Sequence, residues 1–295
     1  MLPAGSMICR HRYKNGKAGE IMKVILRDDD TCFYTKPSEL EEAFGALPDV
    51  PISISVVPHA AYEHRGTFPY SPAVPIAGYA DIAVNQTLVS YLKKQIASGR
   101  FSLMLHAIHH EYHPRSDGEW DTEMRVLSYR QIYDGILEGK KYLEQLFGTN
   151  ISTFIGASND ISADCAAALD KIGLHTNYMV YKKFNRRFSW HNLMNYLRCN
   201  IYRAVTHSRY AGVLRYRRHC EVLSFPFENL RQMKDCYNQC KKAGHPLVVY
   251  THYWSLNANP AEKAEFVEFV NWAISDGADF ITMDQLWKTE HEDTV

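Results

Sequence analysis

Short apolar runs that alternate with amphipathic stretches are the feature that most limits how this chain can fold. Each run has the length of a strand, and most are followed by apolar residues at three- and four-residue spacing, which is typical of a helix packed on a sheet. This alternation predicts an α/β fold with a parallel sheet. The predicted strands are 21–26, 51–57, 101–105, 151–155, 175–181, 221–225, 246–250 and 280–282. The predicted helices are 38–46, 85–98, 128–147, 162–172, 228–243 and 260–275.

Reactive side chains come directly after several of these strands. Parallel α/β barrels place their active sites at the carboxyl ends of the strands. We therefore expect one site that collects the four side chains found at such ends, which are Asp30, His106, Asn159 and His252.

An acidic run, Asp28-Asp29-Asp30, predicts half of a metal site. Adjacent carboxylates repel one another, so a folded protein keeps them only where a cation, protons or hydrogen-bond donors neutralise them. From the residues alone, either the first two or the last two of these aspartates could be the functional pair.

Two histidines predict the other half of the metal site. His106 and His110 are four residues apart, so on one helical turn both imidazoles would face the same side and close on one ion. His109 and His113 have the same spacing and form a rival pair. Together with a carboxylate, two imidazoles suit zinc, with cobalt, nickel or iron as alternatives.

These motifs, in this order, carry a family resemblance. The set Leu26-Arg27-Asp28-Asp29-Asp30, then His106 and His110, then Tyr250-Thr251-His252 resembles the polysaccharide deacetylase superfamily. These are the NodB-like deacetylases of carbohydrate esterase family 4, and the match is to a divergent branch with Arg-x-Asp-Asp in place of Thr-Phe-Asp-Asp-Gly. The resemblance runs from about residue 23 to residue 288.

The resemblance implies a fold and a domain division. The fold is a distorted, incomplete (β/α) barrel of about seven parallel strands. A single domain would occupy residues 21–295. Independently of the resemblance, residues 1–20 are an expected N-terminal segment, in which residues 1–7 are a candidate tag remnant.

The resemblance also implies a role for each motif residue. Asp29 is the general base, and Asp30, His106 and His110 are the metal ligands. The bound ion polarises the acetyl carbonyl and makes water more acidic. His252 is the general acid that protonates the leaving sugar amine. The implied products are acetate and a free amino sugar.

The third family motif, Arg-x-Pro-x-Gly, is where the sequence departs most. Residues 155–159 contain neither the Arg nor the Pro, and in the family that Arg supports the base carboxylate. We expect Arg27 to take its place, because side chains two apart on a regular strand share a face. Asn159 either contacts the substrate or caps the next helix. We expect Glu111 to accept a hydrogen bond from a ligand imidazole.

Aromatic residues beside the motifs are candidates for stacking on sugar rings. We expect Tyr112, Tyr253 and Trp254 to contact the substrate. Trp254 is the strongest of these candidates because it lies two residues after His252.

Residues 181–218 interrupt the alternation of strands and helices and predict an insertion. The stretch contains ten Lys and Arg residues, interleaved with aromatic residues, and no Asp or Glu. It is either a solvated helical hairpin or a patch that attracts an anion or a membrane surface. We expect a substrate that is an acetylated saccharide, linked to phosphate, a nucleotide or a lipid pyrophosphate, and peripheral membrane contact through this insertion.

The overall composition narrows the cellular setting. Lys plus Arg and Asp plus Glu both number 33, which gives no reason to expect nucleic acid as a partner. Seven cysteines without a C-x-x-C pair favour a reducing compartment, and the N-terminus lacks the apolar core of a signal peptide. We expect a cytoplasmic enzyme of O-antigen or capsule biosynthesis. The alternatives are a non-catalytic glycan-binding relative, or an amidase or deformylase that acts on another N-acyl compound.

Overall fold

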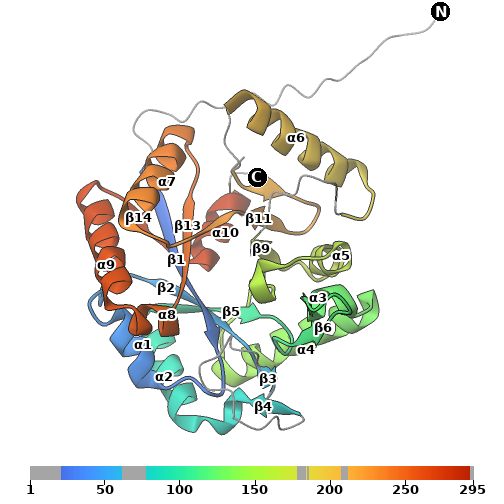
Figure 1. The fold of residues 1–295 in the computed structure, drawn as a ribbon, viewed down its shortest axis with the longest axis horizontal. Coiled ribbons are helices and arrows are strands. Elements are labelled where there is room, and N and C mark those ends of the chain that lie inside the picture. The colour runs from blue at the N-terminus through green and yellow to red at the C-terminus, as the bar shows by residue number, and fades with distance from the viewer. Residues whose placement is uncertain (1–20, 62–77, 178–183, 185, 207–211, 293–295) are drawn as a thin grey trace, which may run out of the picture.

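A computed structural model of the protein describes residues 21–61, 78–177, 184, 186–206 and 212–292. Its main sheet has the order β10-β11-β9-β8-β5-β2-β1-β13-β12, with β14 paired to β1. Figure 1 shows the sheet at the centre of the molecule, with helices around it. The strands are β1 (Lys23–Thr31), β2 (Ile52–Val56), β5 (Phe101–His106), β8 (Thr153–Ile155), β9 (His175–Asn177), β10 (Leu214–Arg215), β11 (Cys220–Val222), β12 (Ser224–Pro226), β13 (Leu247–His252) and β14 (Asp279–Phe280).

The two ends of this sheet are joined by one short piece of chain. β11 and β12 lie near opposite ends of the order, yet only Leu223 separates them in sequence. Residues 220–226 therefore pair with β9 through their first half and with β13 through their second half. Counted as one interrupted strand, they form a seven-stranded parallel array with β1, β2, β5, β8, β9 and β13. The expected distorted, incomplete barrel is confirmed.

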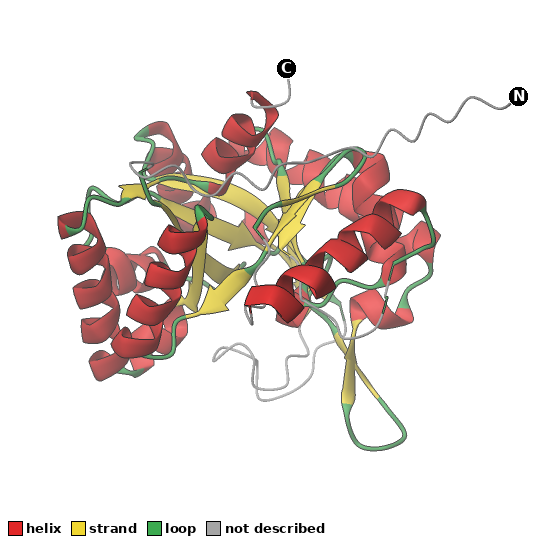
Figure 2. Ribbon diagram, turned by 90° about the horizontal axis from the view of Figure 1, so that it is seen from above, coloured by secondary structure: helices red, strands yellow, loops and turns green. Residues whose placement is uncertain are grey.

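Helices lie on both sides of the strands, as Figure 2 shows. Most begin and end where the sequence predicts. Ser162 caps α5, as the side chain accepts a hydrogen bond from the N–H of Cys165, and Gly173 ends this helix in the left-handed conformation. The helices are α1 (Pro37–Phe44), α2 (Gln86–Ala97), α3 (Glu123–Val126), α4 (Tyr129–Phe147), α5 (Ala163–Ile172), α6 (Trp190–Thr206), α7 (Leu230–Ala243), α8 (Tyr253–Ala258), α9 (Pro260–Ser275) and α10 (Met283–Glu292).

The largest differences from prediction lie near the carboxyl ends of the strands. β1 continues through the acidic run to Thr31, and the predicted strand 221–225 is broken at Leu223. The residues after His106 form a loop that leads into a hairpin of β6 (Tyr112–Pro114) and β7 (Trp120–Thr122). A second hairpin pairs β3 (His59–Ala61) with β4 (Tyr79–Asp81).

Some predicted segments lie outside the described residues. These are the N-terminal segment 1–20, the second half of the strand expected at 175–181, and parts of the insertion at 181–218. The described part of that insertion contains α6 and β10, and α6 lies apart from the helices that surround the barrel (Figure 1). Across the described part of the chain, no helix combines the length and apolar character that crossing a membrane requires.

Candidate metal centre

The backbone of β1 decides where its three acidic side chains point. Side chains alternate along a strand, so Arg27 and Asp29 share one face and Asp28 lies on the other. A regular strand would also turn Asp30 away from Asp29. Instead, Asp30 has a φ of 73°, and the pairing with β2 shifts register between Asp28 and Thr31. This local distortion brings Asp30 to the same side as Asp29.

His106 and His110 meet without the predicted helical turn. His106 ends β5, and the loop after it has a φ of 55° at Ala107 and 57° at His110. This left-handed backbone turns the chain sharply, so both rings face Asp30, with their centroids 4.8 Å apart. The predicted pair is therefore brought together, whereas the predicted helical conformation is wrong.

Asp30, His106 and His110 form one compact, buried donor group. Oδ1 of Asp30 lies 2.9 Å from Nε2 of His106 and 3.3 Å from Nε2 of His110. The three candidate ligand atoms all lie within 4.8 Å of one another. One carboxylate and two imidazoles are donors that zinc and other first-row divalent ions accept. The residues present therefore fit a divalent metal ion.

The protein orients His106 through its second ring nitrogen. Nδ1–H donates a hydrogen bond of 3.0 Å to the carbonyl of Ile155, which leaves Nε2 directed at Asp30. Burial by itself would raise the pKa of Asp30, but hydrogen bonds from His106 and His110 hold that pKa well below its usual value. Burial opposes the charged form of His106, yet the hydrogen bond to Asp30 raises its pKa.

Glu123 holds the loop between the two histidines. Its carboxylate is buried and accepts hydrogen bonds from the backbone N–H of Ile108 at 2.6 Å and of His109 at 2.9 Å. Sequence reasoning missed this residue, because its partners are main-chain groups that leave no pattern in the side chains. The expected acceptor, Glu111, instead accepts a hydrogen bond from Tyr79 on β4, so that prediction is wrong.

Arg27 supports Asp29, as the sequence predicts. Its Nη2 donates to Oδ2 of Asp29 at 2.6 Å and to Oδ1 of Asn159 at 2.5 Å. Ser55 on β2 donates to the other oxygen of Asp29 at 2.5 Å. Burial by itself would raise the pKa of Asp29. The charges of Arg27, His106 and His252 outweigh the effect of burial, so the pKa of Asp29 is lowered. Asn159 therefore contacts Arg27, while Ser162 is the cap of α5.

Asp28 takes no part in this group. It lies on the opposite face of β1, and its Oδ1 accepts a hydrogen bond of 2.6 Å from the N–H of Tyr253 at the start of α8. Burial, reinforced by the neighbouring charge of Asp29, raises its pKa well above the usual value. The structure therefore brings the last two aspartates, and not the first two, to the histidines.

His252 enters the site from β13. In the parallel ladder it is the partner of Asp29, and its Nε2 lies 3.7 Å from Oδ2 of Asp30. The ring of Trp254 lies against that of His252, with centroids 4.9 Å apart, and its Nε1–H donates to Oδ2 of Asp30 at 3.1 Å. Trp254 thus positions the candidate ligand Asp30, a role that the expectation of sugar stacking did not include.

The other two aromatic candidates differ from each other. Tyr112 lies edge-on to His110, with centroids 5.5 Å apart, and its hydroxyl shares a hydrogen bond of 2.7 Å with Ser158. Tyr253 is fully buried, and its hydroxyl is hydrogen bonded to Thr35. The expectation that Tyr253 contacts substrate is therefore wrong, because the first turn of α8 directs its ring into the core.

The rival histidine pair stays apart from the acidic group. His109 stacks on Tyr79 with ring centroids 3.7 Å apart, and its Nδ1 is hydrogen bonded to the carbonyl of His59. His113 lies on the β6 hairpin, 3.9 Å from Glu111. Neither contributes to the donor group.

Left-handed backbone is concentrated at this end of the barrel. Such a conformation costs a residue other than glycine about 1–3 kcal/mol and persists where the surrounding structure holds it, commonly at functional sites. Among the described residues other than glycine, φ is positive at the ends of β1, β5 and β8, at Asp30, Ala107, His110, Ser158 and Asn159.

Comparisons with known proteins show what this fold is similar to. No protein-family model matches the sequence, and no curated protein matches it significantly. A probable polysaccharide deacetylase from Pseudomonas aeruginosa PAO1 superposes with a TM-score of 0.56 at 11% identity, over 92% of this chain and 91% of that one. The chain has the polysaccharide deacetylase fold.

Two further structures share the deacetylase fold. The Xyl-CE4 domain of a multidomain xylanase, from the hindgut metagenome of Trinervitermes trinervoides, gives a TM-score of 0.51 at 10% identity over 92% of each chain. Puue allantoinase gives 0.57 at 11% identity, over 92% of this chain and 90% of that one. At identities this low, the structural similarity shows a shared fold alone. The reaction must therefore be argued from the site.

Proposed function

We propose that this protein is a metal-dependent deacetylase that hydrolyses an N-acetyl or O-acetyl group on a sugar. The observation that carries the proposal is the buried group of Asp30, His106 and His110 at the carboxyl ends of the strands. Asp29 and His252 lie beside this group on paired positions of β1 and β13. In this proposal the arrangement would supply a metal site, a proton acceptor and a proton donor in one place.

The donor group would hold one divalent ion. Zinc suits it best, and cobalt, nickel or iron are alternatives. When bound there, the ion would polarise an acyl carbonyl and make a water molecule more acidic.

Asp29 is the proton acceptor in this proposal. The ion pair with Arg27 keeps its carboxylate ionised. Each carboxylate oxygen has more than one lone pair, so the hydrogen bonds from Arg27 and Ser55 leave capacity to accept a proton from water.

His252 is the proton donor. Its side chain is 30% exposed, whereas that of Asp30 is 2% exposed, so a substrate can reach the imidazole. A proton delivered there to the leaving amine or alcohol would complete hydrolysis. Trp254 packs against the ring and limits its motion.

Metal content and acetate release test the proposal together. Elemental analysis of wild type and the His113→Ala control should find about one equivalent of metal, which Asp30→Ala and His106→Ala lose. Wild type should release acetate from N-acetylated or O-acetylated sugars, and both ligand variants should not. A protein that binds no metal after reconstitution would overturn the proposal and favour a glycan-binding relative without activity.

A second candidate function has one observation in its favour. The similarity to an allantoinase is as strong as the similarity to the deacetylase, at TM-scores of 0.57 and 0.56. The same residues could hydrolyse a C–N bond in a smaller compound. Metal bound at the site without acetate release, together with turnover of other N-acyl or N-formyl compounds, would favour this amidase.

We also propose a biosynthetic setting, the cytoplasmic assembly of a surface polysaccharide such as O-antigen or capsule. The support is the basic composition of residues 181–218, which suits a saccharide linked to phosphate, a nucleotide or a lipid pyrophosphate. Replacing the exposed Arg217 and Arg218 by Gln should reduce activity on phosphorylated sugars more than on neutral ones. Equal effects on both would contradict this setting.

A further inference from the structure

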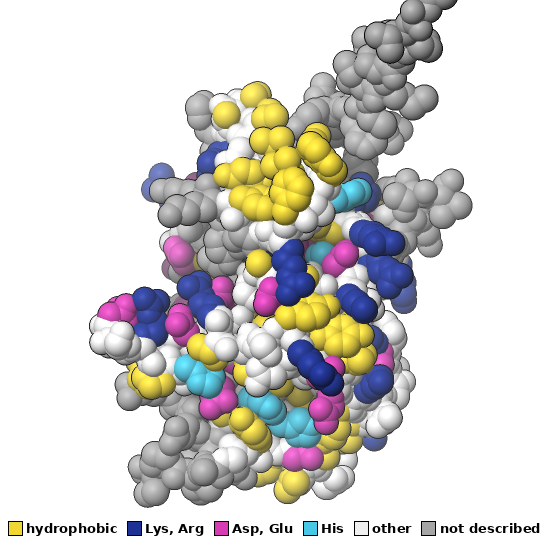
Figure 3. Space-filling model, turned by 90° about the vertical axis from the view of Figure 1, so that its right-hand side faces the viewer, with side chains coloured by type: hydrophobic (Ala, Val, Ile, Leu, Met, Phe, Trp, Pro, Cys, Tyr) yellow, Lys and Arg dark blue, Asp and Glu magenta, His cyan; other side chains and the backbone are white. Residues whose placement is uncertain are grey.

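One face of α6 is a continuous apolar stripe exposed to solvent. Residues three or four apart lie on the same face of a helix, and the large apolar side chains at these positions are 41–75% exposed. Figure 3 shows hydrophobic side chains gathered over this helix. The stripe consists of Trp190, Met194, Leu197, Ile201 and Val205.

The opposite face of α6 is largely polar, includes Cys199 packed against the core, and joins the helix to the rest of the protein. Asn195 is buried, and its Nδ2 donates a hydrogen bond of 3.0 Å to the carbonyl of Arg215 next to the barrel. Asn192 and Tyr196 lie on the same inward side and are partly buried. Surface helices normally turn their apolar stripe toward the core. α6 has the reverse orientation.

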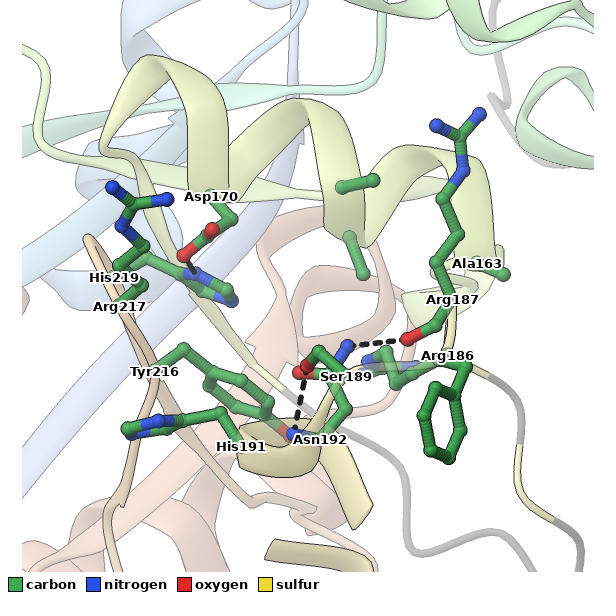
Figure 4. A pocket seen from close by; sticks show the side chains of 13 residues that line it. Ala163, Asp170, Arg186, Arg187, Ser189, His191, Asn192, Tyr216, Arg217 and His219 are labelled. Atoms are coloured by element: carbon green, nitrogen blue, oxygen red, sulfur yellow. Dashed lines mark hydrogen bonds and ion pairs between the residues drawn. The ribbon is translucent and has the colours of Figure 1, made fainter.

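Ion pairs hold the segment that leads into α6. Figure 4 shows the pocket of about 320 Å³ that lies between α5 and the start of α6. Arg187 lies 2.9 Å from Asp164, and Arg186 and His219 lie 3.0 Å and 3.1 Å from Glu221. Each of these charged side chains therefore has a partner of opposite charge within the protein. The pairs also fix the helix so that its apolar stripe stays outward.

The stretch of chain that contains the apolar stripe is basic. Residues 181–218 contain ten Lys and Arg and no Asp or Glu, so this stretch has no acidic side chain of its own to neutralise them. Within the described part of this stretch, Arg186, Arg187 and Arg215 pair with carboxylates elsewhere in the chain. Exposed cations in the described part of the stretch include Arg198, Arg217 and Arg218.

We propose that α6 docks the protein on an anionic lipid surface. An apolar stripe with Trp190 at one end, on a helix that also exposes Arg198 and lies in a basic stretch of chain, is the pattern of a helix that lies in the plane of a membrane interface. The apolar side chains would enter the boundary between headgroups and acyl chains, while the cations contact lipid phosphates. This inference does not rest on the proposed catalytic activity.

The charge distribution favours a lipid surface over a second copy of the chain. In a symmetric dimer the same patch meets itself. The cations beside one stripe would then face those of the other, and the stretch 181–218 supplies no acidic residue to pair with them. An anionic membrane matches both the apolar stripe and the charge around it.

The test is co-sedimentation of the purified protein with vesicles of phosphatidylglycerol and phosphatidylcholine, and with vesicles of phosphatidylcholine alone. Wild type should bind the anionic vesicles, and Ile201→Glu should weaken that binding by about tenfold or more. Ile274→Glu on α9 is the matched control, because Ile274 is an exposed helical isoleucine outside the stripe, 47% exposed against 59% for Ile201. The control should bind as wild type does.

Three outcomes would overturn the proposal. These are failure of wild type to bind anionic vesicles, equal binding by Ile201→Glu and wild type, and equal weakening in the two isoleucine variants. Light scattering after gel filtration gives an independent check. If wild type does not bind vesicles but forms a dimer, and Ile201→Glu dissociates that dimer, the stripe would be assigned to contact with a second copy instead. Acetate release from a water-soluble substrate should be unchanged in Ile201→Glu, which separates this inference from the catalytic proposal.

Discussion

Arg27 links several strands of the barrel through one buried side chain. It contacts Asp29 on its own strand and Asn159 after β8, donates to Ser224 on β12 at 2.9 Å, and lies over the ring of Tyr250 on β13 at 4.6 Å. A buried cation is stable only when its charge is matched and its donors are used. Asp29 matches the charge of Arg27, and both terminal guanidinium nitrogens donate hydrogen bonds, so these contacts keep Asp29 ionised.

Replacing Arg27 by Met should therefore harm both stability and activity. Removing one partner of a buried ion pair typically costs about 3–5 kcal/mol, because the remaining charge is left uncompensated. Urea unfolding should show a decrease of that size, and the turnover number should fall more than the Michaelis constant changes. Arg27→Lys keeps the charge without the planar guanidinium group. Its unfolding free energy and its turnover number should lie between those of wild type and Arg27→Met. Wild-type turnover in Arg27→Met would show that Asp29 does not depend on this cation.

Glu123 should affect metal affinity without touching the metal. It holds the loop from Ala107 to His110 through two backbone N–H groups. Mutation of a residue that orients a metal ligand typically weakens metal affinity about 10–100-fold. Glu123→Gln should therefore show a loss of affinity of that size when a chromogenic chelator competes for the metal. Glu119→Gln, at an exposed position nearby, is the control and should bind metal as wild type does. Unchanged affinity in Glu123→Gln would mean that the loop keeps its shape without this carboxylate.

The roles of these two residues differ in how far sequence predicts them. Arg27 and Asp29 are two apart on a strand, so their contact follows from the alternation of side chains. Glu123 acts on main-chain groups 14 and 15 residues earlier, and no side-chain pattern records such a contact. Tyr253 shows the opposite error, since its position after His252 suggests the site while its ring is buried in the core.

At the level of elements, the stretch from His219 to Glu221 joins β11 to α5 and to the segment before α6. Burial lowers the pKa of His219, but hydrogen bonds with Asp170 and Glu221 outweigh this and raise it above 6.5. Burial raises the pKa of Glu221, but Arg186 and His219 lower it below 4.5. The charged forms of both residues are therefore favoured by folding.

The signs of these shifts predict how stability changes with pH. His219 contributes fully below its unfolded pKa of 6.5, and the contribution is lost as pH rises through the higher folded value. Glu221 contributes above 4.5, and its contribution is lost as pH falls through the lower folded value. The difference in unfolding free energy between wild type and His219→Gln should be largest between about pH 4.5 and 6.5 and shrink at alkaline pH. A difference that grows with pH in urea titrations would contradict this assignment.

Element types follow from the sequence more readily than the conformations that join them. α9 spans the predicted residues because its apolar spacing and Pro260 are local signals. The loop after His106 was predicted as a helical turn, because histidines four apart suit a helix. Left-handed backbone at Ala107 and His110 has no signal in a segment without glycine. The site depends on these conformations, so its geometry required the structure.

For the whole molecule, the class of fold was predictable, and the way in which residues 220–226 join the two ends of the sheet was not. Alternating strands and helices imply a parallel sheet. They do not reveal that residues 220–226 pair with β9 and then with β13, because that switch depends on where the two edges of the sheet meet. The predicted strand 221–225 lies where the structure has β11 and β12. The prediction did not include the break at Leu223 or the change of partner strand.

The position of β1 in the sheet has a consequence for synthesis of the protein on the ribosome. β1 is made more than 200 residues before β13, yet the ladder between the two strands joins residues 24–29 to residues 247–252. Until that late strand emerges, the acidic strand has one long edge without its partner, and His252 and Trp254 are missing from the site. Unpaired strand edges invite association with other chains. A product truncated before β13 would thus combine an incomplete site with an open edge, which makes it a substrate for chaperones and proteases rather than an enzyme with reduced activity.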